Sequence, residues 1–368
     1  MTRAGKIDIN AMKKFVNKKV GLDIAHDLNE DNPTEVKEWI PTGSRWLDSI
    51  ICRGKMAGIP VGKITELAGL SSAGKSYMAC QIAAQAQKKG HCVVYFDAES
   101  AIDPLFLLNS GIDINNDFLY IQAVSVEKTL ETIEDLMGQW PDTQFLFIWD
   151  SIAATSSEKD LEGDFNPQSS MAVKPRIFAK AFPKLTIPLA NHQCTLLLIN
   201  QLKTNITSNI AEAMTTPLVA PGGKAIEYFC SLRIWLTKRK AKASFVTDNT
   251  GLRIGSEVKA KVEKSRFGSE GRTCGFKILW GKEVGIQDEE SWLEALRASG
   301  SDRFKPGAWN KIYDTKGKEF KFQRSQWIKK LQDPEFRSVV LDIMDDEIIR
   351  KFESEGKNFG LEGESEEG

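Results

Sequence analysis

The eight residues that begin at Gly69 and end at Ser76 constrain this chain most, because they satisfy G-x-x-x-x-G-K-[ST] at every fixed position. Glycines let the backbone turn tightly and aim several N–H groups at one anion. An apolar run, 64–68, enters the loop, and an Ala/Gln-rich helical segment leaves it. This strand–loop–helix context predicts a nucleotide phosphate site formed by Gly69, Leu70, Ser71, Ser72, Ala73, Gly74, Lys75 and Ser76.

Two side chains at the end of this loop carry the chemistry expected of such a site. Lys75 is expected to reach the β- and γ-phosphates, and the Ser76 hydroxyl is expected to ligate Mg²⁺. The loop by itself does not indicate how the energy of the nucleotide is used.

Composition excludes several other classes of protein. The 368 residues carry a net charge of only −1, so any nucleic-acid binding must come from local basic patches. The six cysteines are far apart and form no C-x-x-C pair, which argues against a zinc ribbon or a disulfide framework. No apolar run approaches membrane-spanning length, and no signal-peptide core is present. We therefore expect a cytoplasmic protein with no metal site beyond that of the nucleotide and no membrane partner.

The residue composition and the hydrophobic pattern along the chain predict four regions. Residues 1–38 are polar with one weakly amphipathic piece, and we expect them to dock on another surface. Residues 39–285 alternate strand-like and helical runs, which indicates an α/β fold with a mostly parallel sheet flanked by helices and an antiparallel extension. Residues 286–352 read as a small α+β appendage, in which two helical stretches surround a short strand pair, and residues 353–368 as an acidic disordered tail.

Polar residues at the ends of three predicted strands supply further chemistry, because active sites of such sheets lie at the carboxyl ends of the strands. Asp97 and Glu99 follow the strand after the loop helix, where a carboxylate can orient and deprotonate a water molecule. Asp150 ends a strand of four apolar residues and a tryptophan, the usual position of an acid that holds the Mg²⁺ shell. Gln201 ends a third strand, and its uncharged amide suits the sensing of a γ-phosphate.

Taken together, these motifs resemble the RecA family of DNA strand-exchange recombinases. The resemblance covers roughly residues 39–285, and the order and spacing of its motifs make it specific. Its pieces are "IPTGSRWLDSIICRGKMAGIPVGKITELAG", "FDAESAIDPLF", "FIWDSIAA", "DLEGD", "INQ" and "PGGKAIEYF". The run "VEKSRFG" and the appendage after it are more similar to the phage UvsX branch than to bacterial RecA.

The resemblance implies ATP as the nucleotide and adds roles for individual residues. Glu99 corresponds to the family's catalytic glutamate. Asp103 and Phe106 correspond to positions that contact adenine, with Phe106 in place of a stacking tyrosine. The alternative for Phe106 is an ordinary core aromatic. Gln201 corresponds to the residue that couples γ-phosphate occupancy to the DNA-binding loop after it.

A pair of cations, Lys264 and Arg266 in "VEKSRFG", is similar to family residues that reach the ATP of the neighbouring subunit. Cations supplied across an interface neutralise the charge that develops in phosphoryl transfer. The alternative is a solvated basic strand end.

Two polar loops are expected to contact DNA, at about 156–171 and 202–221. Each begins shortly after a phosphate-sensing residue, so ordering by ATP can pass into it. The segment between them contains Pro175, Pro183 and Pro188 where the family has a long helix, and proline kinks helices. A basic cluster from Lys238 to Lys242 extends the positive surface or forms an ordinary hairpin. The expected DNA-binding residues are Gly163, Phe165, Arg176, Lys203, Gly222, Gly223 and Lys224.

The resemblance therefore implies an ATP-dependent recombinase that forms a helical filament on single-stranded DNA and exchanges strands with homologous double-stranded DNA. A recombination mediator and a single-strand DNA-binding protein are the further partners that it implies. Two alternatives remain at this stage. One is a hexameric RecA-fold helicase or DNA motor, and the other is an ATP-gated recombination mediator without strand-exchange activity.

Overall fold

The computed structural model describes residues 8–21, 25–28, 35–52, 56–163, 173–205, 217–238, 244–280 and 284–346. Residues 1–38 and 39–368 form two separate compact units. The first unit contains helix α1 (Ile9–Val20), which Asp8 caps by accepting a hydrogen bond from the Ala11 N–H group. None of the residues of α1 is buried within its own unit, and its apolar side chains, such as Phe15, are exposed.

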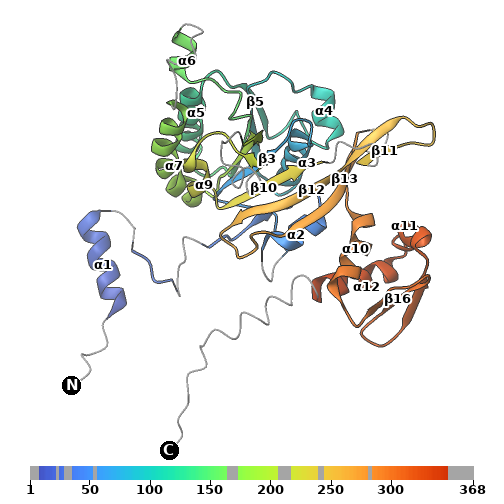
Figure 1. The fold of residues 1–368 in the computed structure, drawn as a ribbon. Coiled ribbons are helices and arrows are strands. Elements are labelled where there is room, and N and C mark those ends of the chain that lie inside the picture. The colour runs from blue at the N-terminus through green and yellow to red at the C-terminus, as the bar shows by residue number, and fades with distance from the viewer. Residues whose placement is uncertain are drawn as a thin grey trace, which may run out of the picture. The chain divides into compact units, whose positions relative to one another are not determined.

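The second unit is organised around one ten-stranded sheet (Figure 1). Its parallel part has the order β10-β3-β7-β6-β4-β5, with strands β3 (Ile64–Gly69), β4 (Cys92–Asp97), β5 (Phe118–Gln122), β6 (Phe145–Asp150), β7 (Thr195–Gln201) and β10 (Leu232–Thr237). An antiparallel extension continues from β10 through β12 (Arg253–Ser265), β13 (Thr273–Trp280) and β14 (Val284–Gln287), and β11 (Phe245–Thr247) pairs with β12. This is the mostly parallel α/β architecture expected from the alternating runs.

Helices cover both faces of the sheet and bury its apolar side chains (Figure 1). One core lies under α2 (Arg45–Ile51), α3 (Lys75–Lys88) and α4 (Pro104–Asn109). The other lies under α5 (Val126–Gln139), α7 (Val173–Asn191) and α9 (Lys224–Phe229). Because strand side chains alternate between faces, Leu197 belongs to the first core and Leu196 to the second.

Two short strand pairs and one short helix lie outside the ten-stranded sheet. Strands β1 (Trp39–Ile40) and β2 (Ile59–Pro60) form one antiparallel pair, and β8 (Lys203–Thr204) and β9 (Leu218–Val219) form another. The short helix α6 (Glu158–Glu162) follows β6 and carries a capping box at Ser157.

Helix α7 is one continuous helix of 19 residues although Pro183 and Pro188 lie inside it. A proline removes one backbone hydrogen bond, but four apolar side chains of α7 are buried against the sheet, and burial of this kind outweighs local propensity. The doubt that the prolines raised about a long helix here was therefore wrong.

The C-terminal appendage packs around its own core, in which aromatic side chains such as Phe322 and Trp327 pack with aliphatic ones. Its elements are α10 (Glu289–Ser299), β15 (Phe304–Lys305), β16 (Asn310–Tyr313), β17 (Glu319–Phe322), the 3₁₀ turn Arg324–Gln326, α11 (Trp327–Lys330) and α12 (Pro334–Met344). The sequence predicted a strand pair, whereas β15, β16 and β17 form a three-stranded sheet. The two residues of β15 are too few to leave a periodic signal.

The motif T-G-S-x-x-L-D, which contributed to the family resemblance, joins the appendage to the sheet domain. Ser44 caps α2, and its hydroxyl also donates to the buried Asp288 carboxylate at 3.0 Å. Arg45 forms an ion pair of 2.7 Å with Asp345 after α12. Asp48 is buried and accepts two hydrogen bonds from Thr42. This motif therefore has a structural role in the chain.

Candidate nucleotide site and nucleic-acid interface

The phosphate-binding loop connects β3, at the centre of the parallel sheet, to α3. All six residues of β3 are buried, so the loop starts from a fixed position. Gly74 has a φ of +87°, a backbone conformation that favours glycine, and a Cβ there would also displace the end of the Ile278 side chain. The Lys75 ammonium donates to the Leu70 carbonyl at 3.1 Å, so it folds back over the loop.

Ser76 and Asp150 meet beneath this loop, as expected for two residues that hold Mg²⁺. Burial raises the pKa of the Asp150 carboxyl above its usual value, and hydrogen bonds donated by Ser76 and Tyr95 oppose that rise. The Tyr95 hydroxyl donates to Oδ2 of Asp150 at 2.7 Å. Burial also lowers the pKa of Lys75, against the attraction of Asp150 and Glu99. A buried carboxylate beside a hydroxyl fits a divalent cation, because the cation would stabilise the charged form of Asp150.

Asp97 and Glu99, which the sequence placed together, have different environments. The buried Asp97 carboxylate accepts hydrogen bonds from the N–H groups of Glu99, Ala101 and Ile102 at 3.0–3.1 Å, so it builds the turn after β4. Glu99 lies beyond the end of β4 and is exposed, and it accepts a hydrogen bond from the Ser151 hydroxyl at 3.2 Å. Glu99 is therefore the carboxylate that can reach a water molecule.

A pocket of about 170 Å³ brings Glu99, the candidate general base, together with the two candidate Mg²⁺ ligands. Ser76, Glu99 and Asp150 line it with Phe106, whose ring is half-buried and lies edge-on to that of Tyr77 at 5.9 Å. Asp103, by contrast, is exposed and caps α4 by accepting a hydrogen bond from the Leu105 N–H group. The geometry thus leaves Phe106 open to a ligand and gives Asp103 a capping role.

Sheet register places Gln201 beside the start of the phosphate-binding loop. Gln201 pairs with Gly69 between β7 and β3, and the next residue, Leu202, donates its N–H group to the Gly69 carbonyl at 3.0 Å. The Gln201 side chain is exposed. A sensor of the γ-phosphate at this position is geometrically reasonable, and the second polar loop begins immediately after it.

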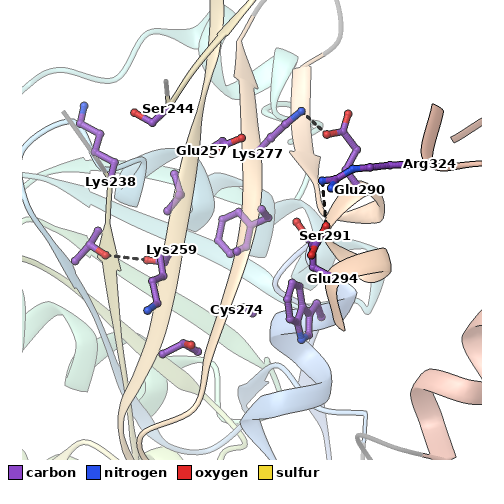
Figure 2. A pocket seen from close by; sticks show the side chains of 16 residues that line it. Lys238, Ser244, Glu257, Lys259, Cys274, Lys277, Glu290, Ser291, Glu294 and Arg324 are labelled. Atoms are coloured by element: carbon purple, nitrogen blue, oxygen red, sulfur yellow. Dashed lines mark hydrogen bonds and ion pairs between the residues drawn. The ribbon is translucent and has the colours of Figure 1, made fainter. Parts of the chain in front are cut away.

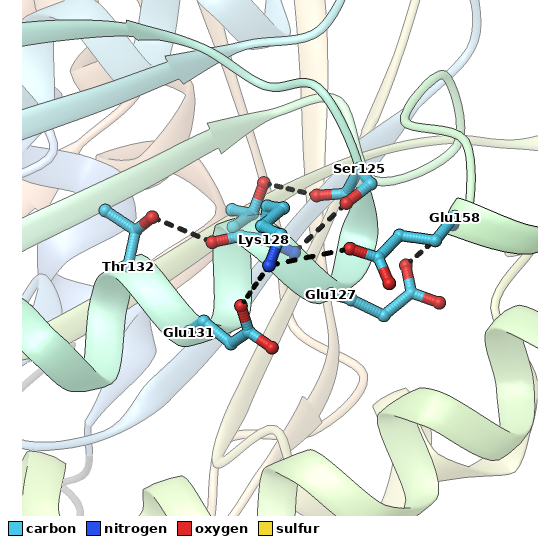
Figure 3. A network of polar contacts seen from close by, with 7 residues as sticks. Ser125, Glu127, Lys128, Glu131, Thr132 and Glu158 are labelled. Carbon is cyan, nitrogen blue, oxygen red and sulfur yellow. Dashed lines mark hydrogen bonds and ion pairs between the residues drawn. The ribbon is translucent and has the colours of Figure 1, made fainter. Parts of the chain in front are cut away.

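The first polar loop is anchored at its start by the N-terminus of α5 (Figure 3). Glu127 accepts a hydrogen bond from the Glu158 N–H group at 3.0 Å, and Lys128 lies 3.7 Å from the Glu158 carboxylate. The Lys128 ion pairs are exposed and contribute little stability. The hydrogen bond from the Glu158 N–H group to the Glu127 carboxylate is therefore the more important anchor. Gly163 is exposed at the end of α6, whereas Phe165 lies outside the described residues.

The bases of the two loops meet at a cavity of about 360 Å³. Lys174 and Pro175 at the start of α7, Lys203 at the start of the second loop, and Gly222 at its end all line this cavity. Arg176, Gly223 and Lys224 are exposed nearby in sequence. Burial lowers the pKa of Lys174, whose ammonium donates to the Ala153 carbonyl at 3.3 Å.

Lys174 is the cation that sequence reasoning missed. In the sequence it is one of many lysines, and only its position two residues before Arg176 distinguishes it. Its place in the cavity depends on packing between two loops that are distant in the chain.

Lys264 and Arg266 both bind the C-terminal end of helix α9. Lys264 donates to the carbonyls of Glu227 and Tyr228, and Arg266 donates to the Tyr228 carbonyl at 2.9 Å. Burial lowers the pKa of Lys264, and the nearby Arg266 lowers it further. Cations at a helix C-terminus satisfy carbonyls that lack helical partners. The two residues are thus tied to the helix that begins at Gly223 and Lys224.

A larger groove of about 690 Å³ lies on the antiparallel extension, next to α10 (Figure 2). Lys238 and Lys259 line one side. On the other side Lys277 pairs with Glu290, and Arg324 pairs with Glu294. Of the basic cluster predicted at 238–242, only Lys238 lies within the described residues, so the cluster as a whole stays a prediction.

Within the described ranges, no group of three or more His, Cys, Asp or Glu side chains is arranged to hold a metal ion. No helix in that part of the chain is long and apolar enough to cross a membrane.

Known proteins are similar to this chain over most of its length. Residues 7–286 match the model of the RecA N-terminal domain. The chain is 29% identical over 325 residues to Protein RecA of Mannheimia haemolytica, which covers 88% of this chain and 82% of that protein. It is 30% identical over 294 residues to Protein RecA of Wigglesworthia glossinidia brevipalpis, which covers 80% of this chain and 83% of that protein. The chain therefore belongs to the RecA family.

Proposed function

We propose that this protein is an ATP-dependent recombinase that forms a filament on single-stranded DNA and exchanges strands with a homologous duplex. The observation that carries the proposal is the position of Gln201, which pairs with Gly69 of the phosphate-binding loop and leads directly into a loop whose base lines the Lys174–Lys203 cavity. Only Leu202 therefore separates Gln201, the proposed γ-phosphate sensor, from Lys203, a proposed DNA contact.

Hydrolysis would use the residues gathered around the 170 Å³ pocket. Glu99 orients and deprotonates the attacking water, Lys75 leaves the Leu70 carbonyl for the phosphates, and Asp97 keeps the Glu99 turn in place. Mg²⁺, held through Ser76 and Asp150, would supply charge neutralisation at the phosphates. Phe106 would contact adenine; Asp103, at the start of the same helix, is the weaker candidate.

Completion of the site by a neighbouring subunit is part of the proposal. Lys264 and Arg266 would reach the ATP of the next subunit, which makes hydrolysis depend on assembly. Because both residues also hold α9, DNA bound at Gly222, Gly223 and Lys224 would act on the same helix. Lys174, Arg176 and Lys203, with Gly163 and Phe165 of the first loop, would complete the DNA contacts.

The phage UvsX-like branch, a mediator and a single-strand DNA-binding protein as partners, and a cytoplasmic location complete the proposal. They rest on the family resemblance and on the "VEKSRFG" run.

The test is the steady-state rate of ATP hydrolysis with and without single-stranded DNA, with Lys75→Ala as the blank. We expect strong stimulation by DNA that rises steeply with protein concentration, because active sites are completed by assembly. Lys264→Ala should abolish the stimulation, whereas Lys261→Ala, an exposed lysine of the same strand, should retain it. A rate that DNA does not change would refute the recombinase, and closed rings in electron micrographs would favour the helicase.

A further inference from the structure

Asn200, the residue before the proposed sensor, uses every hydrogen-bonding group of its side chain. Its amide nitrogen donates to Glu66 Oε1 and to the Pro221 carbonyl, each at 2.8 Å, and its amide oxygen accepts from the Gln201 N–H group at 2.9 Å. Asn200 is fully buried. A carboxylate and a carbonyl only accept and a backbone N–H only donates, so one orientation of the amide satisfies all three partners.

The Glu66 end of this network is rigid. Arg233 donates to Glu66 Oε2 at 2.6 Å, and both side chains are almost fully buried. Glu66, Arg233 and Asn200 lie on the adjacent strands β3, β10 and β7, in the order β10-β3-β7. The network therefore spans the three central strands of the sheet.

The Pro221 end belongs to the proposed DNA loop. Pro221 closes the loop that begins at Leu202 and immediately precedes Gly222 and Gly223. The arms of the loop are already joined at its base, where β8 pairs with β9. The bond from Asn200 to the Pro221 carbonyl adds a direct link between the loop exit and the end of β7.

Alternation along β7 gives Asn200 and Gln201 opposite directions. Asn200 is in phase with Leu196 and Leu198, which belong to the core under α7 and α9. Gln201 is in phase with Leu197 and Ile199, which belong to the core under α3, the helix that follows the phosphate-binding loop. Gln201 thus faces the side of the sheet that carries the nucleotide loop helix α3, and Asn200 faces the side that carries α7 and α9, next to the proposed DNA site.

We propose that Asn200 is a positioning residue that couples nucleotide occupancy to DNA affinity by tethering the Pro221 carbonyl to the backbone of Gln201. The inference rests on the proposed function. A shift of Gln201 toward a γ-phosphate moves the Asn200 amide, which is bonded to the Gln201 N–H group, and the tether passes that shift to Pro221, Gly222 and Gly223. Without the tether, the nucleotide site and the DNA site both remain, but nucleotide binding changes the affinity for DNA less.

The decisive variant is the exchange Glu66→Gln with Asn200→Asp. It moves the carboxylate from position 66 to position 200 and the amide from position 200 to position 66. The network therefore keeps one negative charge near Arg233, and the side chains at positions 66 and 200 can still share a hydrogen bond. An aspartate cannot donate, so the tether to Pro221 is lost and a carboxylate oxygen faces the Pro221 carbonyl in its place. Glu66→Gln alone is the control for loss of the buried carboxylate, because it leaves Asn200 with an amide that can still donate to the Pro221 carbonyl.

The measurement is the ratio of single-stranded DNA dissociation constants with ADP and with a non-hydrolysable ATP analogue. Coupling between sites in proteins is commonly about 5- to 150-fold. We expect the exchange variant to lose most of the wild-type ratio, while its analogue affinity without DNA stays close to that of the control. A wild-type ratio in the exchange variant would overturn the inference, and so would an equal loss of DNA affinity in both nucleotide states.

Hydrogen exchange on the wild-type protein tests the tether even if the exchange variant does not fold. The analogue alone, without DNA, should change the exchange rates of the Gly222 and Gly223 amides, and unchanged rates would overturn the tether. Failure of the recombinase itself is distinguishable, because the wild-type protein would then show neither DNA-stimulated hydrolysis nor a nucleotide-dependent DNA affinity.

Discussion

At the scale of single residues, the two carboxylates at the end of β4, Asp97 and Glu99, have different roles. Asp97 is buried and accepts hydrogen bonds mainly from backbone N–H groups, whereas Glu99 is exposed in the pocket and accepts one from the Ser151 hydroxyl. The sequence places both residues at the same turn. Only their burial shows that Asp97 stabilises the turn and that Glu99 is the candidate general base.

We expect Glu99→Gln to lower the turnover number for ATP about 10²- to 10⁴-fold, because general base catalysis contributes about that much. Nucleotide affinity should change little, since Glu99 does not hold the phosphates. Steady-state kinetics together with fluorescent-nucleotide titration separate the two effects. A variant that turns over at the wild-type rate would show that another group activates the water.

Tyr95 is a second residue whose role follows from one atom. Its hydroxyl donates to Asp150 Oδ2 and so fixes the carboxylate that is expected to hold the Mg²⁺ shell. Tyr95→Phe should weaken Mg²⁺-dependent nucleotide binding about 10-fold or more, as losses of such supporting contacts do. The check is a Mg²⁺ titration of nucleotide binding, with binding in EDTA as the reference. An unchanged Mg²⁺ dependence would mean that Asp150 needs no such support.

At the scale of elements, the start of α2 holds the joint between the sheet and the appendage. Burial raises the pKa of Asp48 from its usual 3.8 to about 7, hydrogen bonds from Thr42 act in the opposite direction, and the nearby Asp288 raises it further. Because its pKa is higher in the folded than in the unfolded chain, the folded state binds more protons between these two values. The free energy of unfolding therefore falls as pH rises through this window.

Asp48→Asn should remove this decrease in the free energy of unfolding at high pH, because an amide oxygen carries no charge and can still accept hydrogen bonds from Thr42. We expect the variant to exceed the wild type in stability at pH 8, by at most about 4 kcal/mol, and the gain to shrink as the pH approaches 5. Chemical denaturation at the two pH values measures it. Asp302→Asn, at an exposed position, is the matched control and should show no such trend. A gain that is independent of pH would point to packing instead of charge.

At the scale of the whole molecule, a shared active site makes a prediction about mixtures. Glu99→Gln subunits keep Lys264, and Lys264→Ala subunits keep Glu99, so each variant alone should be inactive. Random mixing in equal amounts would place an intact Glu99 against an intact Lys264 at about a quarter of the interfaces of a head-to-tail filament. DNA-stimulated hydrolysis should therefore return to about that fraction of the wild-type rate. A mixture that stays inactive would contradict a site shared between subunits.

The sequence by itself determined the residues whose chemistry is local. The phosphate-binding loop, its flanking strand and helix, and the strand ends at Asp150 and Gln201 follow from hydrophobic runs and fixed motif spacing, because the carboxyl ends of parallel strands meet at one edge. The alternation of strands and helices likewise determined the sheet and its antiparallel extension.

Only the tertiary structure decided the rest. The long helix α7 persists despite two prolines because its buried face outweighs them. Lys174, Asn200 and the T-G-S-x-x-L-D joint gain their roles from partners that are distant in the chain, at Ala153, Glu66 and Asp288. Such contacts depend on sheet register and on packing between loops, and neither leaves a periodic signal in one sequence.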